Sequence, residues 1–165
     1  MKLKPVPEVL VFGDPAALDI WPAAPAWAWN YAALLCQAEE SLTRREQAYP
    51  EWIRSGRIAS DAAEADIAAW RLIVAEWRWI VRGDGELPPP HTLTARRAAI
   101  ELSLERVEAE ARRRRSPELI DQQERLGALL WHLQRTEHGA PKVHRLARLS
   151  RLLRADAAPQ KAAAA

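Results

Sequence analysis

Cysteine and glycine are scarce in this sequence, and their scarcity argues against several classes of function. Cys36 is the one cysteine among 165 residues, so the chain cannot form an internal disulfide, and nothing favours an oxidising compartment. Gly83 and Gly85 follow a predicted helix and precede prolines, which is the wrong context for a phosphate-binding loop. No apolar run approaches the roughly 20 residues that span a bilayer. The sequence therefore predicts a cytoplasmic protein that does not bind membranes.

Patterns typical of catalytic and metal sites are also missing. The four histidines lack the close helical spacing of a zinc site, and no paired cysteines accompany them. Cys36 falls on the apolar face of a predicted helix, where a buried structural thiol is the better interpretation than a nucleophile. We therefore expect no catalytic residue, no metal ion and no cofactor, and a function that depends on binding.

Strand character is confined to one segment near the N-terminus, Val9–Phe12. A single strand cannot satisfy its own backbone groups. It either packs as an extended arm over helices, which we favour, or adds to the sheet edge of another chain. Asp14 and Pro15 then predict a short helix start.

Most of the remaining chain repeats apolar residues at helical spacing, which predicts an all-α fold. The predicted parts are an extended arm and short helix (1–24), a first helical hairpin (25–83), a proline-rich linker (84–93), a second hairpin (94–139), and a basic helix with a disordered tail (140–165). Their apolar stripes must be buried. We expect a helical bundle, closed within one chain or completed in a homodimer, rather than two paired hairpins acting as separate modules.

Capping and helix-breaking residues set the expected helix bounds. The first long helix is predicted to begin near Pro25, and Pro50 either kinks it or opens a separate turn of helix. Gly56 and Gly83 suit left-handed helix ends. The predicted N-caps of the following helices are Ser60, Thr94 and Ser116, the last followed by Pro117.

Eight tryptophans are many for a chain of this length. Trp70 and Trp77 belong to the apolar stripe of the second long helix and are predicted core residues. Trp29, Trp79 and Trp131 lie off the stripes, so each is either part of a second packing surface or an anchor for a protein partner.

Basic residues accumulate at two places. From Lys142 onward six basic residues face one acidic residue, a net charge of +5, which leaves −3 for the rest of a chain whose total is +2. This C-terminal arginine row either docks on the acidic body of the protein or meets nucleic acid or an acidic partner. The run Arg112–Arg115 either clamps phosphates or stabilises a helix C-terminus. The candidate nucleic-acid contacts are Arg112, Arg113, Arg114, Arg115, Arg145, Arg148, Arg151 and Arg154.

The segment RREQAYPEWIRSGRI, residues 44–58, resembles a group of small uncharacterised phage and prophage proteins over residues 42–75. The resemblance implies a helical hairpin and a mobile-element context, and it transfers no functional residue. Our first hypothesis is a non-enzymatic phage accessory protein that binds another protein, for example to inhibit a host defence complex. The alternative is a nucleic-acid-binding accessory factor that uses the basic C-terminal helix.

Overall fold

The computed structural model describes residues 24–134 and, beyond them, residues 141, 143–145, 147–149, 151–153 and 155. The predicted arm with Val9–Phe12, the side chain of Arg154 and the alanine-rich tail lie outside the described residues. In the described part of the chain, no helix is both long enough and apolar enough to cross a bilayer.

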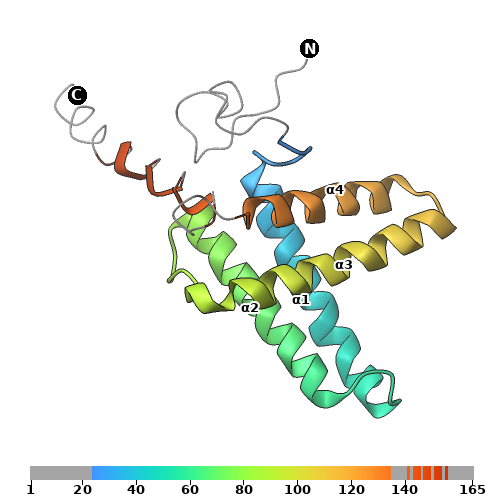
Figure 1. Ribbon diagram of the computed structural model, residues 1–165. Coiled ribbons are helices and arrows are strands. Elements are labelled where there is room, and N and C mark those ends of the chain that lie inside the picture. The colour runs from blue at the N-terminus through green and yellow to red at the C-terminus, as the bar shows by residue number, and fades with distance from the viewer. Residues whose placement is uncertain are drawn as a thin grey trace.

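The described chain is all-α, as the sequence predicts, and its helices form two hairpins that cross each other (Figure 1). The first hairpin consists of α1 (Tyr31–Arg54) and α2 (Ser60–Arg82). A short 3-10 helix, η2 (Pro90–Thr92), leads into the second hairpin of α3 (Leu93–Arg113) and α4 (Pro117–His132). Because α1 also packs against α4, and α2 against α3, the hairpins share one core.

The core is richest along α2, where the predicted stripe is buried. Trp70 and Trp77 are fully buried, which confirms their predicted place in the core. An indole buries roughly 150–250 Å², so each contributes about 4–6 kcal/mol of transfer free energy at about 25 cal/mol per Å². Leu34 of α1, Ile100 of α3 and Leu129 of α4 reach the same cluster, so all four long helices depend on it.

Several predicted helix starts are wrong by a few residues. The first long helix begins at Tyr31 rather than near Pro25, because the side chain of Asn30 accepts a hydrogen bond from the Ala33 amide and so caps it. Ser60 and Thr94 are not caps: α2 starts at Ser60 itself, and α3 starts at Leu93, without a side-chain cap bond at either end.

Pro50 neither ends α1 nor opens a separate helix, since α1 continues through it to Arg54. Proline at this position removes one backbone hydrogen bond. The helix persists because buried Tyr49 and half-buried Trp52 anchor both sides of the proline. The predicted left-handed glycines Gly56 and Gly83 are confirmed by φ values of 71° and 78°. Ser116 caps α4 as predicted, accepting from the Leu119 amide.

Helical residues recur between positions 143 and 155 and pack on the end of α2. Val143 and Ala147 are fully buried in the shared core. The basic C-terminal segment thus docks on the body of its own chain, which was one of the two alternatives for it.

Cys36 is exposed, so the expectation of a buried thiol is wrong. It lies on the outer side of α1, and its thiol donates a hydrogen bond to Glu40 at 3.5 Å. Partial desolvation and this neighbouring carboxylate raise the pKa of the thiol. A raised pKa keeps the thiol protonated at neutral pH, which makes it a poor nucleophile.

Candidate functional site: an arginine groove

The end of α1 folds back on itself and places an arginine on a tryptophan. Gly56 adopts φ of 71°, which lets its amide donate to Ile53 while the amide of Arg57 donates to the carbonyl of Trp52 at 2.8 Å. This pair of bonds is a Schellman motif, a common way to end a helix. The guanidinium of Arg57 consequently lies 4.4 Å from the centroid of the Trp52 ring, in cation–π contact.

Helix α3 brings two more arginines to the same place. Arg106 and Arg113 are seven residues apart, so they share one face of the helix. That face meets the end of α1. Trp52 and Arg106 line both of two neighbouring hollows, and we name the two hollows together the arginine groove.

The inner hollow of the groove has a volume of about 310 Å³ and lies between α1, α3 and α4. It is lined by Ser41, Arg44, Arg45, Ala48, Tyr49, Trp52, Ser103, Arg106, Val107 and Gln122. The outer hollow, of about 440 Å³, is lined by Trp52, Arg57, Ile58, Arg106, Ala109, Glu110 and Arg113. Aromatic and aliphatic walls therefore stand beside arginines in both.

Three of these arginines carry charge that the described residues do not neutralise. No described carboxylate pairs with Arg57, Arg106 or Arg113. The nearby Glu110 is paired with Arg114 at 2.9 Å. Charges on a shared concave surface add to a positive potential that attracts anions.

Two arginines of the groove are paired with carboxylates: exposed Arg44 with Glu40 at 3.5 Å, and the more buried Arg45 with Asp66. The Nε of Arg45 donates to Asp66 at 2.7 Å and its Nη2 donates to Ser103 at 2.6 Å, so it joins α1, α2 and α3. The hydroxyl of Tyr49 donates to the same carboxylate of Asp66. Burial, and then the hydrogen bond to Asp66, raise the pKa of Tyr49. Asp66 thus binds Arg45 and Tyr49 on the floor of the groove. It does not neutralise the charges of Arg57, Arg106 and Arg113.

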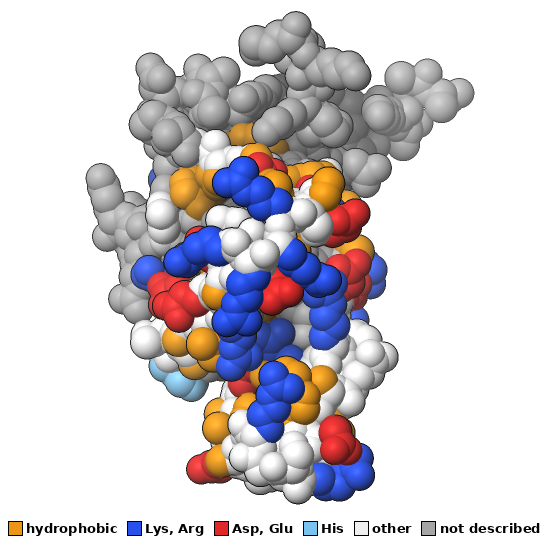
Figure 2. Space-filling view, turned by 90° about the vertical axis from the view of Figure 1, so that its right-hand side faces the viewer, with side chains coloured by type: hydrophobic (Ala, Val, Ile, Leu, Met, Phe, Trp, Pro, Cys, Tyr) orange, Lys and Arg blue, Asp and Glu red, His pale blue; other side chains and the backbone are white. Residues whose placement is uncertain are grey.

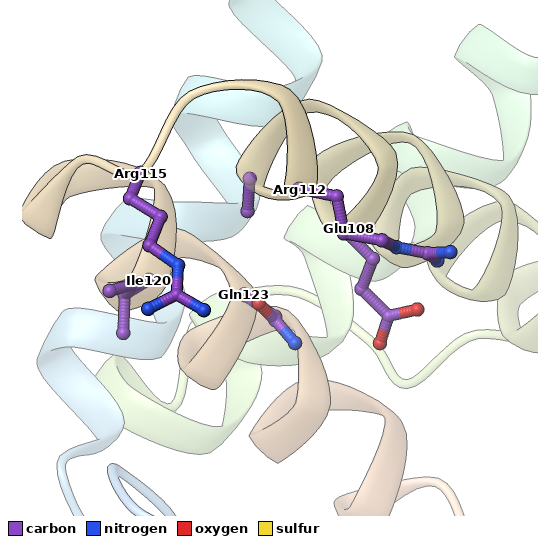
Figure 3. A pocket seen from close by; sticks show the side chains of 6 residues that line it. Glu108, Arg112, Arg115, Ile120 and Gln123 are labelled. Atoms are coloured by element: carbon purple, nitrogen blue, oxygen red, sulfur yellow. The ribbon is translucent and has the colours of Figure 1, made fainter.

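The run Arg112–Arg115 spreads over the end of α3, because successive helical residues point about 100° apart. Arg113 enters the groove and Arg114 pairs with Glu110. Arg112 and Arg115 stand on opposite sides of a third hollow with Gln123 between them (Figure 3). Figure 2 looks at this end of the molecule and shows basic side chains gathered across its middle, with acidic ones beside them.

The three predicted tryptophan anchors are half-buried and packed against the core of their own chain. The rings of Trp29 and Trp131 meet edge to face at 5.6 Å, and both contact the buried ring of His132. The Trp79 ring is covered by the guanidinium of Arg151 at 3.8 Å. These tryptophans therefore act as a second packing surface in the described structure.

The described arginines of the predicted C-terminal row differ in their contacts. Arg151 donates to the carbonyls of Trp79 and Ile80 at the end of α2, where the helix dipole favours a cation. Arg145 and Arg148 are exposed. The C-terminal segment that carries them lies by the C-terminal end of α2, at the opposite end of the first hairpin from the end of α1 (Figure 1).

A buried charged cluster ties this C-terminal segment to the core. Glu76 is fully buried between Arg96, at 2.5 Å, and the Nε2 of His144, also at 2.5 Å. Among the described residues no three histidine, cysteine or carboxylate side chains are placed to share a metal ion. The cluster therefore holds α2, α3 and the C-terminal segment together.

Sequence reasoning missed most of the groove, namely Arg44, Arg45, Trp52, Arg57 and Arg106. The spacing of Arg106 and Arg113, and of Arg45, Tyr49 and Trp52, was available as a helical-face pattern. Which face of α1 would meet which face of α3 depends on how the two hairpins cross, and that is a tertiary property.

Comparison of the chain with protein-family models, curated proteins and solved structures finds no match.

Proposed function

We propose that this protein binds nucleic acid through the arginine groove, by contact with the phosphate backbone. The observation that carries the proposal is a set of three arginines on one concave surface, none of them paired with a described carboxylate: Arg57, Arg106 and Arg113. Guanidinium groups bind phosphates through paired, charge-assisted hydrogen bonds. Each neutralised phosphate also releases counterions, which gives affinity without any need for sequence recognition.

The same surface suits nucleic acid better than a protein anchored by tryptophans. Trp29, Trp79 and Trp131 are engaged by packing within the chain, and Arg151 covers Trp79. The groove instead offers an aromatic wall beside its cations, a combination typical of nucleic-acid channels. A nucleic-acid-binding accessory factor is therefore favoured over a protein-binding inhibitor, with the groove rather than the C-terminal row as the main contact.

The test is fluorescence anisotropy with a short labelled oligonucleotide at several salt concentrations. We expect the triple variant Arg57→Gln/Arg106→Gln/Arg113→Gln to bind about tenfold or more weakly, and the slope of log K against log salt to fall by about 2 for a single strand. The double variant Arg145→Gln/Arg148→Gln should change both quantities less, because these arginines lie away from the groove.

The chain offers a matched control with the same loss of charge. Arg71, Arg78 and Arg97 pair with Glu46, Glu39 and Glu101, so their replacement by Gln removes three neutralised cations. This control should keep most of the affinity and of the salt slope. The proposal is wrong if the control loses as much as the groove variant. It is also wrong if poly-glutamate of equal charge binds as tightly as the oligonucleotide, since the groove would then recognise an acidic protein.

A further inference from the structure

The inner hollow of the groove has apolar walls, whereas charged arginines form its rim. Ala48, Val107 and the rings of Tyr49 and Trp52 form its walls, while the arginines stand around them. A volume of about 310 Å³ falls at the small end of the range of ligand pockets, about 300–1,000 Å³. A phosphate alone needs no such apolar space, but a flat aromatic group beside a phosphate does.

Polar groups in the inner hollow differ in how far they are already satisfied. The hydroxyl of Ser103 donates to the carbonyl of Ala99 and accepts from Arg45. Gln122 of α4 is half-buried, and no hydrogen bond within the described residues engages its amide. A primary amide carries both donors and an acceptor, which match the edge of a nucleobase.

We infer that the inner hollow receives one unpaired nucleobase, so that the protein binds single strands in preference to duplexes. This inference rests on the proposed function. The base packs against the wall formed by the rings of Tyr49 and Trp52, whose centroids lie 5.4 Å apart, and meets the Gln122 amide. Its flanking phosphates follow Arg106 into the outer hollow toward Arg57, which covers the Trp52 ring, and Arg113. A duplex keeps its bases paired and stacked, so it reaches only the rim.

The hollow can be closed without touching a cation. Ala48 is half-buried in the last third of α1 and lines the hollow, and leucine forms helices nearly as well as alanine. Ala48→Leu should therefore fill the space while the fold and the arginines remain. Circular dichroism and the thermal midpoint establish that the variant is folded. If Ala48→Leu fails to fold, Gln122→Leu provides a second comparison, because it removes the amide that meets the base and leaves every arginine in place.

The experiment compares three probes with the same number of phosphates: a base-bearing single strand, a fully abasic single strand, and a duplex, each prepared in DNA and RNA where the chemistry allows. Stacking of a base on an aromatic side chain contributes about tenfold to hundredfold in affinity. We expect the wild-type protein to bind the base-bearing strand at least about tenfold more tightly than the abasic strand. Ala48→Leu should remove this difference and leave the salt slope unchanged.

Failure of the inference differs from failure of the proposed function. Equal affinity of the wild-type protein for base-bearing and abasic strands would mean that the groove recognises only the charge of the backbone. The inferred base site would then be wrong, whereas binding to the phosphate backbone would still be supported. The inference also fails if Ala48→Leu retains the preference for bases. If no probe binds at low salt, or the triple arginine variant binds as the wild type does, the proposed function itself is wrong.

Discussion

Arg96 and Arg106 lie ten positions apart on the same helix, and the structure uses them for opposite tasks. Arg96 is 1% exposed and pairs with the fully buried Glu76 at 2.5 Å. Arg106 faces the groove, and no described carboxylate pairs with it. The difference arises from the opposing helix: α2 brings a glutamate to one arginine, whereas the end of α1 brings Trp52 to the other. An arginine that pairs with a buried carboxylate stabilises the fold. An arginine on the surface that no described carboxylate neutralises is available to a ligand.

Arg45 is intermediate between these two cases. It lines the groove, yet its side chain is only 11% exposed and Asp66 neutralises it. Its guanidinium also stacks over buried Trp70 at 4.5 Å. We therefore expect Arg45 to shape the groove, while Arg106 and its unpaired neighbours bind.

Arg96→Met should give the largest loss of stability. The substitution keeps a long side chain but removes one partner from a buried ion pair, so Glu76 is left with its hydrogen bond to His144. Breaking such a pair costs about 3–5 kcal/mol. Urea unfolding followed by circular dichroism would measure the free energy of unfolding.

A double variant sharpens this prediction. Arg96→Met/Glu76→Met removes the uncompensated charge and should recover much of the lost stability, because paired replacement by apolar residues is often neutral. A single variant as stable as the wild type would show that the buried cluster does not hold α2 to α3, and the contrast with Arg106 would lose its basis.

Tyr49→Phe should have an intermediate effect, since it removes the hydrogen bond to Asp66 on the groove floor. A bond to a charged group contributes about 1.5–3 kcal/mol. The pKa of Tyr49 is raised in the folded protein, so below its ordinary value of about 10 both states are protonated and the contribution is complete. As the pH rises above that value, the unfolded state ionises first and the contribution is lost toward the folded pKa.

The variant should accordingly lose less stability between neutral pH and pH values above 10 than the wild type does. Chemical denaturation at a series of pH values measures the difference. Tyr31→Phe is a useful companion, because burial also raises the pKa of Tyr31 but its hydroxyl has no hydrogen-bond partner among the described residues. It should flatten the alkaline dependence without the loss at neutral pH. Equal losses for both variants at neutral pH would contradict the role given to Asp66.

Sequence periodicity predicted the helices, because burial of an apolar stripe is a local property that each segment encodes by itself. Trp70 and Trp77 were predicted for that reason, and the Ser116 cap was predicted from the equally local pairing of a capping side chain with Pro117. The groove could not be predicted in full, since Arg57 depends on the Gly56 turn and Arg106 on the crossing of two hairpins. The sequence also leaves Arg96 and Arg106 indistinguishable as charged positions on α3. Only the partner that each one meets separates them.

Arg113→Gln should have the smallest effect on stability and still reduce binding. The side chain is exposed and has no described carboxylate partner, so its replacement should change the free energy of unfolding by less than about 0.5 kcal/mol. It should lower the salt slope for a single-stranded oligonucleotide by about 0.7, one phosphate contact. The matched control is Arg78→Gln, which loses an exposed ion pair with Glu39 and should leave the slope unchanged. Anisotropy titrations and thermal unfolding of both variants test this prediction. Equal salt slopes for the two variants would show that an arginine in the groove without a described carboxylate partner is no more available to phosphate than a paired arginine outside the groove.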